Sequence, residues 1–159
     1  MKFKSYLLIF IASILIFTSS LFATAITNPT YKQTVTNYIE QLSQLQNQVF
    51  TLARKATFGS PESKSTFNSE LDFINNSLKK TMDSMNSYYQ TLPPKSTERR
   101  NMLILVNAST LIESSLFQLN AINNTDSDVE KMVLLEDYFR FKVEATDTLN
   151  LVQHLLSEY

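Results

Sequence analysis

Residues 31–56 read YKQTVTNYIEQLSQLQNQVFTLARKA, and apolar side chains recur in them every three or four residues. These apolar positions are Tyr31, Val35, Tyr38, Leu42, Leu45, Val49, Leu52 and Ala56. Alternating spacings of four and three make a seven-residue repeat, which aligns the side chains along one stripe of an α-helix. The stretch therefore predicts a long amphipathic helix of coiled-coil type that must bury this stripe against other helices.

A second helix is predicted after the first one ends. Gly59 followed by Ser60-Pro61 is typical of a helix end and a new helix start, and Pro93-Pro94 ends the second segment. The apolar stripe of this segment consists of Phe67, Leu71, Ile74, Leu78, Met82, Met85, Tyr89 and Leu92.

Two further helices are predicted in the remaining sequence. Ser96 or Thr97 can cap the third helix, and Ser127 with Glu130 has the spacing of a capping box that opens the fourth. The third stripe consists of Met102, Leu105, Ile112, Leu116, Leu119 and Ile122. The fourth consists of Met132, Leu135, Phe139, Val143, Thr146, Leu149, Val152 and Leu156.

The connections between these four segments are short, which predicts that consecutive helices lie antiparallel. No segment shows the alternation of a strand, so the expected fold is all-α. It is an antiparallel up-down-up-down four-helix bundle. In that topology the start of the first helix, the Pro93-Pro94 connection and the carboxyl terminus share one end of the bundle.

The chain begins with a basic segment followed by an apolar one. Lys2 and Lys4 precede an uncharged stretch that extends from Ser5 to Tyr31. An apolar core of about 12 residues and the small residues of Ala23-Thr24-Ala25 match a signal peptide that is cleaved after Ala25.

The same span also fits a single membrane anchor, because residues 5–26 reach the ~20 residues that cross a bilayer as a helix. We expect residues 1–25 to be a signal peptide or signal anchor and residues 26–159 to form the bundle domain. The basic end should stay in the cytoplasm and the bundle outside it. Cleavage would give a secreted or periplasmic protein, and retention would give a membrane-anchored one.

The composition excludes several classes of function. The 159 residues include no cysteine and one histidine, His154, so thiolate sites and sites with two imidazoles are excluded. Beyond residue 25 the chain has 12 basic and 15 acidic groups, which argues against nucleic-acid binding. The single glycine leaves no glycine-rich phosphate loop. We therefore expect no cofactor and no metal.

Catalysis by carboxylates is also not expected. The acidic residues of the helices mostly flank the apolar stripes, as on solvated faces. Glu113 is the one exception of interest, because it adjoins Ile112 in the most apolar helix and its charge would need a partner or water there. No nucleophile and base are brought together by spacing, so the chain is predicted not to be an enzyme.

Two aromatic residues and several glutamines are candidates for a protein contact surface. Phe73 and Phe141 lie next to the apolar stripes of their helices and not within them. Gln41, Gln44 and Gln48 belong to an almost uncharged polar face of the first helix. Such a face can pack against a partner helix, or a second copy, without burying charge.

Four basic residues should gather at the end of the bundle that carries the amino terminus. They are Lys32, Lys95, Arg99 and Arg100. In an anchored protein they would lie close to lipid headgroups, where each basic group gains about 1 kcal/mol against anionic lipid.

The sequence thus predicts an exported, non-enzymatic bundle that acts through protein–protein contacts at the cell envelope. The alternative is an extracytoplasmic sensor that binds a small ligand between its helices. An enclosed polar pocket would favour the sensor, whereas a filled core with an exposed phenylalanine or glutamine face would favour the interaction protein.

Overall fold

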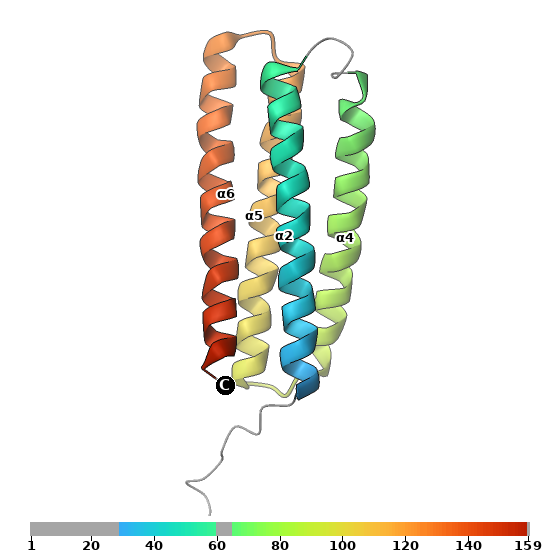
Figure 1. The fold of residues 1–159 in the computed structure, drawn as a ribbon, viewed down its shortest axis with the longest axis vertical. Helices are drawn as coiled ribbons and strands as arrows, with labels where there is room; N and C mark the ends of the chain where they lie inside the picture. The colour runs from blue at the N-terminus through green and yellow to red at the C-terminus, as the bar shows by residue number, and fades with distance from the viewer. Residues whose placement is uncertain (1–28, 60–64, 159) are drawn as a thin grey trace, which may run out of the picture.

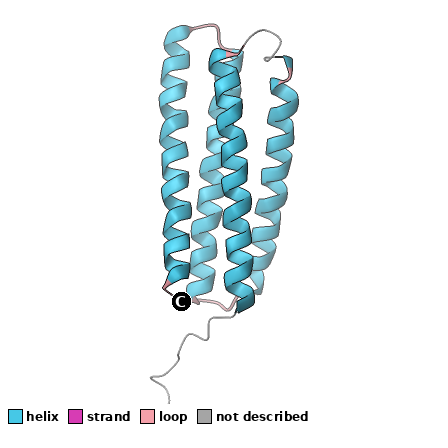
Figure 2. Cartoon of the chain, in the orientation of Figure 1, coloured by secondary structure: helices cyan, strands magenta, loops and turns pink. Residues whose placement is uncertain are grey.

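The computed structural model describes residues 29–59 and 65–158, and this part of the chain consists of four α-helices without a strand. The helices are α2 (Pro29–Phe58), α4 (Phe67–Thr91), α5 (Thr97–Asn124) and α6 (Asp128–Ser157). They stand side by side, and each runs opposite to the one before it in the chain (Figure 1). Figure 2 shows the described connections as short loops. The prediction of an all-helical fold with four helices is confirmed.

Some expectations concern residues that the structure does not describe. The signal peptide or anchor at residues 1–25 lies outside the described residues, and so does the expected helix start at Ser60-Pro61. The first described helical residue, Pro29, follows the expected cleavage point closely in sequence.

The helix ends follow local rules with one difference from expectation. The Gly59 N–H donates to the Lys55 carbonyl at 2.9 Å, and Gly59 does not take the left-handed backbone conformation expected of a helix-ending glycine. Lys95 takes that conformation instead, with φ 63°, where the chain turns from α4 into α5. Ser96 and not Thr97 caps α5, since its side chain accepts a hydrogen bond from the Arg99 N–H at 3.1 Å.

The core runs along the whole bundle, in which α2 and α5 each pack against all three other helices, and the most extensive contact is that between α5 and α6. All eight predicted stripe positions of α2 are buried, and so are all six of α5. In α4 the stripe is buried from Phe67 to Met85, except that Met82 is half-buried, as are Tyr89 and Leu92 near the end of the helix.

Within the described residues, α5 is long and apolar enough to cross a membrane by length and composition alone. Its buried positions include Leu105, Ile112 and Leu119, which pack in the core of the bundle. Burial of this face in the core therefore accounts for the apolar character of α5.

The predicted stripe of α6 is correct only near the carboxyl-terminal end of the helix. Leu149, Val152 and Leu156 are buried as expected, but Met132, Phe139 and Val143 are exposed. Tyr138 and Ala145 occupy the core instead. The amino-terminal half of α6 carries apolar residues on most of its sides, so spacing alone cannot select a face. Packing against α5 selects the face that continues the Leu149 stripe.

Candidate interaction surfaces

The most exposed aromatic side chain of α4 lies in a groove between α2 and α4. The Phe73 side chain is 64% exposed and lines two neighbouring surface cavities of about 320 and 220 Å³. Gln48 of α2 lines both cavities, and Gln41 and Gln44 line the smaller one. The structure thus joins Phe73 to the three glutamines proposed from sequence. We call this surface, formed by Gln41, Gln44, Gln48 and Phe73, the Phe73 groove.

The Phe73 groove is nearly neutral. Among the described residues that line its two cavities, Glu70 is the charged one. The Glu70 carboxylate forms an ion pair with the Lys55 ammonium. Farther along, the Thr81 hydroxyl donates to the Ser77 carbonyl of its own helix at 3.1 Å and lies 3.4 Å from the Gln41 side-chain oxygen, a long contact between the two helices. A ligand in this groove would therefore meet one aromatic ring and several amide groups without an unpaired charge.

Phe141 lies elsewhere. It is half-buried on α6, and the Arg140 guanidinium carbon is 5.1 Å from the centroid of its ring. It lines neither cavity of the Phe73 groove. The two phenylalanines that the sequence suggested as contact residues do not share a surface.

Three of the four predicted basic residues surround one cavity at the end of the bundle. Lys95, Arg99 and Arg100 line a cavity of about 440 Å³ next to the connection between α4 and α5. The Arg99 guanidinium carbon lies 4.3 Å from the centroid of the Tyr89 ring, which also lines this cavity. This cation–π contact holds the Arg99 side chain against α4.

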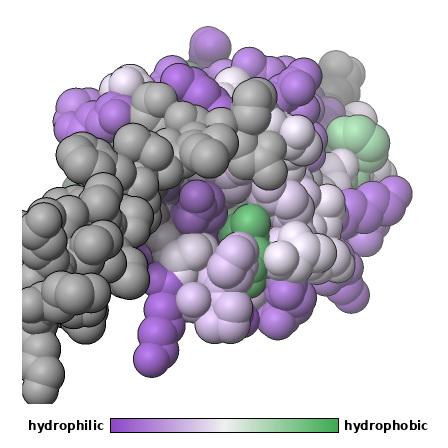
Figure 3. All heavy atoms as spheres, turned by 90° about the horizontal axis from the view of Figure 1, so that it is seen from below, coloured by the Kyte–Doolittle hydropathy of each residue, from purple (hydrophilic) through white to green (hydrophobic). Residues whose placement is uncertain are grey.

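Lys32 lies at the same end in the first turn of α2. The neighbouring Tyr31 hydroxyl donates to the Glu98 carbonyl at 3.3 Å, which ties the start of α2 to the start of α5. Figure 3 views this end; on the part that is not grey, pale side chains of intermediate hydropathy border a small apolar patch, and strongly hydrophilic ones lie farther out. The basic residues lie at this end of the bundle, and their contact with a membrane stays a prediction.

Two tyrosine rings meet at a tilted angle between α2 and α4. The Tyr38 and Tyr88 rings have centroids 6.2 Å apart, and the Tyr38 hydroxyl shares a hydrogen bond of 2.9 Å with the Ser84 hydroxyl. Burial raises the pKa of Tyr88, and the hydrogen bond from Thr34 opposes that rise. These contacts join α2 to α4.

No metal centre appears among the described residues, because no three side chains of histidine, aspartate or glutamate come together there. Glu113 is exposed and lines a surface cavity with Lys79 and Asp83. Its charge is therefore solvated, and it needs no buried partner.

Sequence reasoning missed the polar atoms that the core encloses. Both side-chain polar atoms of Asn101 and the hydroxyl of Tyr138 are buried without a hydrogen-bond partner in the described part of the chain. Burial raises the pKa of Tyr138 to about 12. Asn101 adjoins the predicted stripe residue Met102, and this adjacency is the one sequence signal that points to it.

No protein-family model, curated protein or solved structure matches the chain.

Proposed function

We propose that the protein is an exported, non-enzymatic helical bundle that binds a helical segment of another protein in the Phe73 groove. The observation that carries this proposal is the 64% exposure of Phe73 beside three uncharged glutamines of α2. An isolated exposed phenylalanine is common, but one that lines two adjoining cavities offers a docking site for an apolar side chain.

The chemistry of the groove favours an amphipathic partner helix with few charges. Phe73 supplies an apolar anchor, and each glutamine amide can both donate and accept a hydrogen bond. Covering these amides costs less than covering charged groups, because hydrogen bonds to the partner can replace those to water. Among the described residues that line the groove, Glu70 is the charged one, and its ion pair with Lys55 leaves little charge with which to recruit a charged partner.

Export rests on the amino-terminal pattern of Lys2, Lys4 and the apolar residues that follow them. An uncleaved anchor would place the basic end of the bundle near the membrane surface, and Lys32, Arg99 and Arg100 would then face anionic headgroups. Cleavage would release the same bundle as a diffusible binding protein of the cell envelope.

The small-ligand sensor receives less support. A cavity of about 310 Å³ lies between α2 and α6, but Phe50, Phe58, Leu135 and Phe139 line it, and Phe58 is 85% exposed. A ligand site usually adds several convergent polar groups to an enclosed apolar pocket. Arg54 and Thr57 are the polar side chains that line this cavity, and both belong to α2, so polar groups do not converge on it from several helices.

The proposed partner contact is tested by photo-crosslinking in the native host. A benzophenone amino acid replaces Phe73 in the full chain, and a second version carries it at Phe117, which is 70% exposed on α5. We expect a discrete crosslinked product from position 73 that position 117 does not give. The same products from both positions, or none from position 73, would contradict the proposal.

The affinity for a captured partner then measures the role of the anchor. We expect Phe73→Ala to weaken binding about tenfold or more, as truncation of an aromatic anchor commonly does. Phe117→Ala is the matched control, and it should leave the affinity unchanged.

A further inference from the structure

The side of α6 that faces away from the core is exposed, and it carries several apolar side chains among charged ones. Its apolar side chains are Val129, Met132, Val133, Phe139 and Val143, with exposed fractions between 49% and 76%. We call this surface, together with Glu136 and Arg140 between them, the outer α6 face. Its residues are in the half of α6 where the predicted core stripe failed, so the helix has a second apolar surface that its own bundle does not cover.

The central residues of the outer α6 face are arranged in a self-complementary order. Val133, Glu136, Arg140 and Val143 are separated by three, four and three residues, which places them on one line along the helix. The order reads apolar, acidic, basic, apolar. Read from the other end it has the same spacings with the charges exchanged. An isologous contact between two identical surfaces requires this kind of complementarity.

Arg140 and Glu136 are the charged side chains of the outer α6 face that could pair across such a contact. The Arg140 guanidinium forms an ion pair with Asp137 on the same helix, which fixes its position and leaves other N–H donors available. Glu136 is exposed and forms no ion pair in the described part of the chain. A neutral partner that covered this face would strip water from Glu136 without replacing it, at a substantial cost.

We propose that a second copy of this chain covers the outer α6 face, with its α6 antiparallel to the first. The two-fold axis then passes near the level of Tyr138. Val133 lies opposite Val143 of the second copy, and Glu136 lies opposite its Arg140. Both ion pairs form at once because the axis exchanges the two chains.

Phe139 connects this contact to further apolar surface. It also lines the cavity of about 310 Å³ between α2 and α6, together with Phe50 and Phe58. The apolar area next to the axis therefore extends onto α2. A membrane surface fits the outer α6 face less well, because Glu136 and the neighbouring acidic residues Glu144 and Asp147 would be repelled by anionic headgroups.

The test uses the absence of native cysteine from the sequence. One full-length chain carries Val133→Cys and a differently tagged one carries Val143→Cys, and they are expressed together and oxidised gently. In the antiparallel pair these two positions lie at the same level. Two copies of position 133 are displaced by ten residues along the axis, about 15 Å, which is beyond the ~7 Å Cα separation that a disulfide spans.

We expect the mixed disulfide between positions 133 and 143 to form at least about tenfold more than either same-position disulfide. Phe117→Cys, on the exposed side of α5, should form no disulfide above background. Absence of the mixed product would overturn the proposal. Stronger linkage of position 133 to itself would overturn it too, since that result requires parallel helices.

Charge-exchange variants distinguish a specific contact from a non-specific one. Glu136→Arg in both cysteine chains places arginine opposite arginine and should lower the mixed disulfide about tenfold or more. Combining Glu136→Arg in one chain with Arg140→Glu in the other restores opposite charges across the axis and should restore the disulfide. Failure of this rescue while circular dichroism shows both variants folded would also overturn the proposal. The Phe73 groove takes no part in this contact, so the result does not depend on the proposed function.

Discussion

Asn101 and Tyr138 show what single polar residues do inside this core. Asn101 is fully buried, and its amide has no hydrogen-bond partner in the described residues. An unsatisfied buried polar group costs about 1–3 kcal/mol, which the surrounding apolar contacts must offset.

Tyr138 leads to a prediction about alkaline stability. Burial raises its pKa to about 12 from the ordinary value of 10.0. Above pH 10 the unfolded chain releases this proton while the folded chain keeps it, so the stability present below pH 10 is lost as the pH rises toward 12. We expect Tyr138→Phe to remove this part of the alkaline loss, and urea unfolding at pH 9 and pH 11 measures it.

At pH 9, Tyr138→Phe should be at least as stable as the original chain, because the hydroxyl that it removes has no partner among the described residues. Tyr89→Phe is the matched control, since Tyr89 is half-buried and not enclosed by the core. An equal alkaline loss in the original chain and in Tyr138→Phe would show that Tyr138 ionises in the folded state as readily as in the unfolded one.

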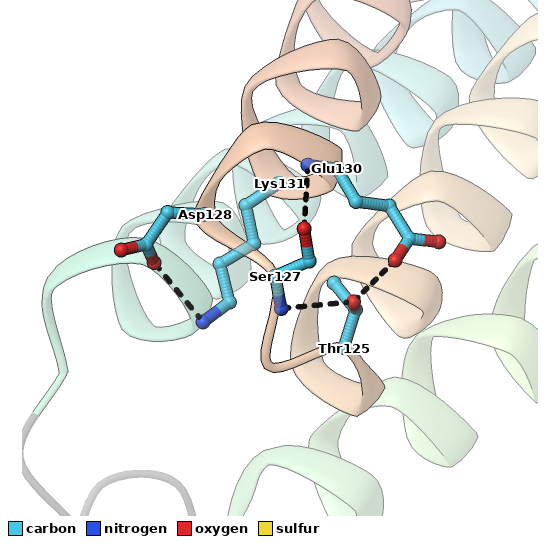
Figure 4. Close-up of polar contacts among 5 residues, drawn as sticks. All are labelled: Thr125, Ser127, Asp128, Glu130 and Lys131. Carbon is cyan, nitrogen blue, oxygen red and sulfur yellow. Dashed lines mark hydrogen bonds and ion pairs between the residues drawn. The ribbon is translucent and has the colours of Figure 1, made fainter.

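Among the elements, the start of α6 departs from the predicted capping box in one respect. The Ser127 hydroxyl accepts a hydrogen bond from the Glu130 N–H at 3.3 Å, as expected (Figure 4). The Glu130 carboxylate does not reach the Ser127 N–H directly. The Thr125 hydroxyl lies between them, since it donates to the Glu130 carboxylate and accepts from the Ser127 N–H at 3.3 Å. One threonine thus links the loop to both halves of the cap.

Ser127→Ala should lower the free energy of unfolding by about 1 kcal/mol, because the Glu130 N–H loses its side-chain acceptor at the helix start. Thermal or urea unfolding measures the change. Ser87→Ala is the control, since the exposed Ser87 hydroxyl donates to the Asp83 carbonyl of its own helix at 2.8 Å. Surface substitutions of this kind change the free energy of unfolding by no more than about 0.5 kcal/mol. Equal effects of the two substitutions would mean that the cap contributes nothing special to α6.

At the scale of the whole molecule, the antiparallel arrangement decides which functions can act together. The start of α2, the connection between α4 and α5 and the end of α6 lie at one end (Figure 1). Lys95, Arg99 and Arg100 are at that end, where an uncleaved anchor would enter. The Phe73 groove runs between α2 and α4, and the outer α6 face belongs to another helix. A second copy on α6 would therefore leave the groove open for another partner.

The state of the amino terminus is predicted at this scale. Cleavage after Ala25 removes none of the described helices, because α2 begins at Pro29. We expect the protein recovered from its host to begin at Ile26 and to be found in the soluble fraction. Intact mass and amino-terminal sequencing of the soluble and membrane fractions check this. A full-length chain in the membrane fraction would instead show that residues 5–26 are an anchor, and neighbours in the membrane would then be the candidates for the Phe73 groove.

The sequence by itself determined the four helices and most of their buried stripes, because a helical period, a proline pair and a capping serine act over a few residues. Only the tertiary structure decided which side of α6 enters the core, since that helix offers two apolar sides and α5 accepts one. Only it joined Phe73 to glutamines on another helix and separated it from Phe141. Contacts between helices depend on rotation and register, which local spacing does not encode.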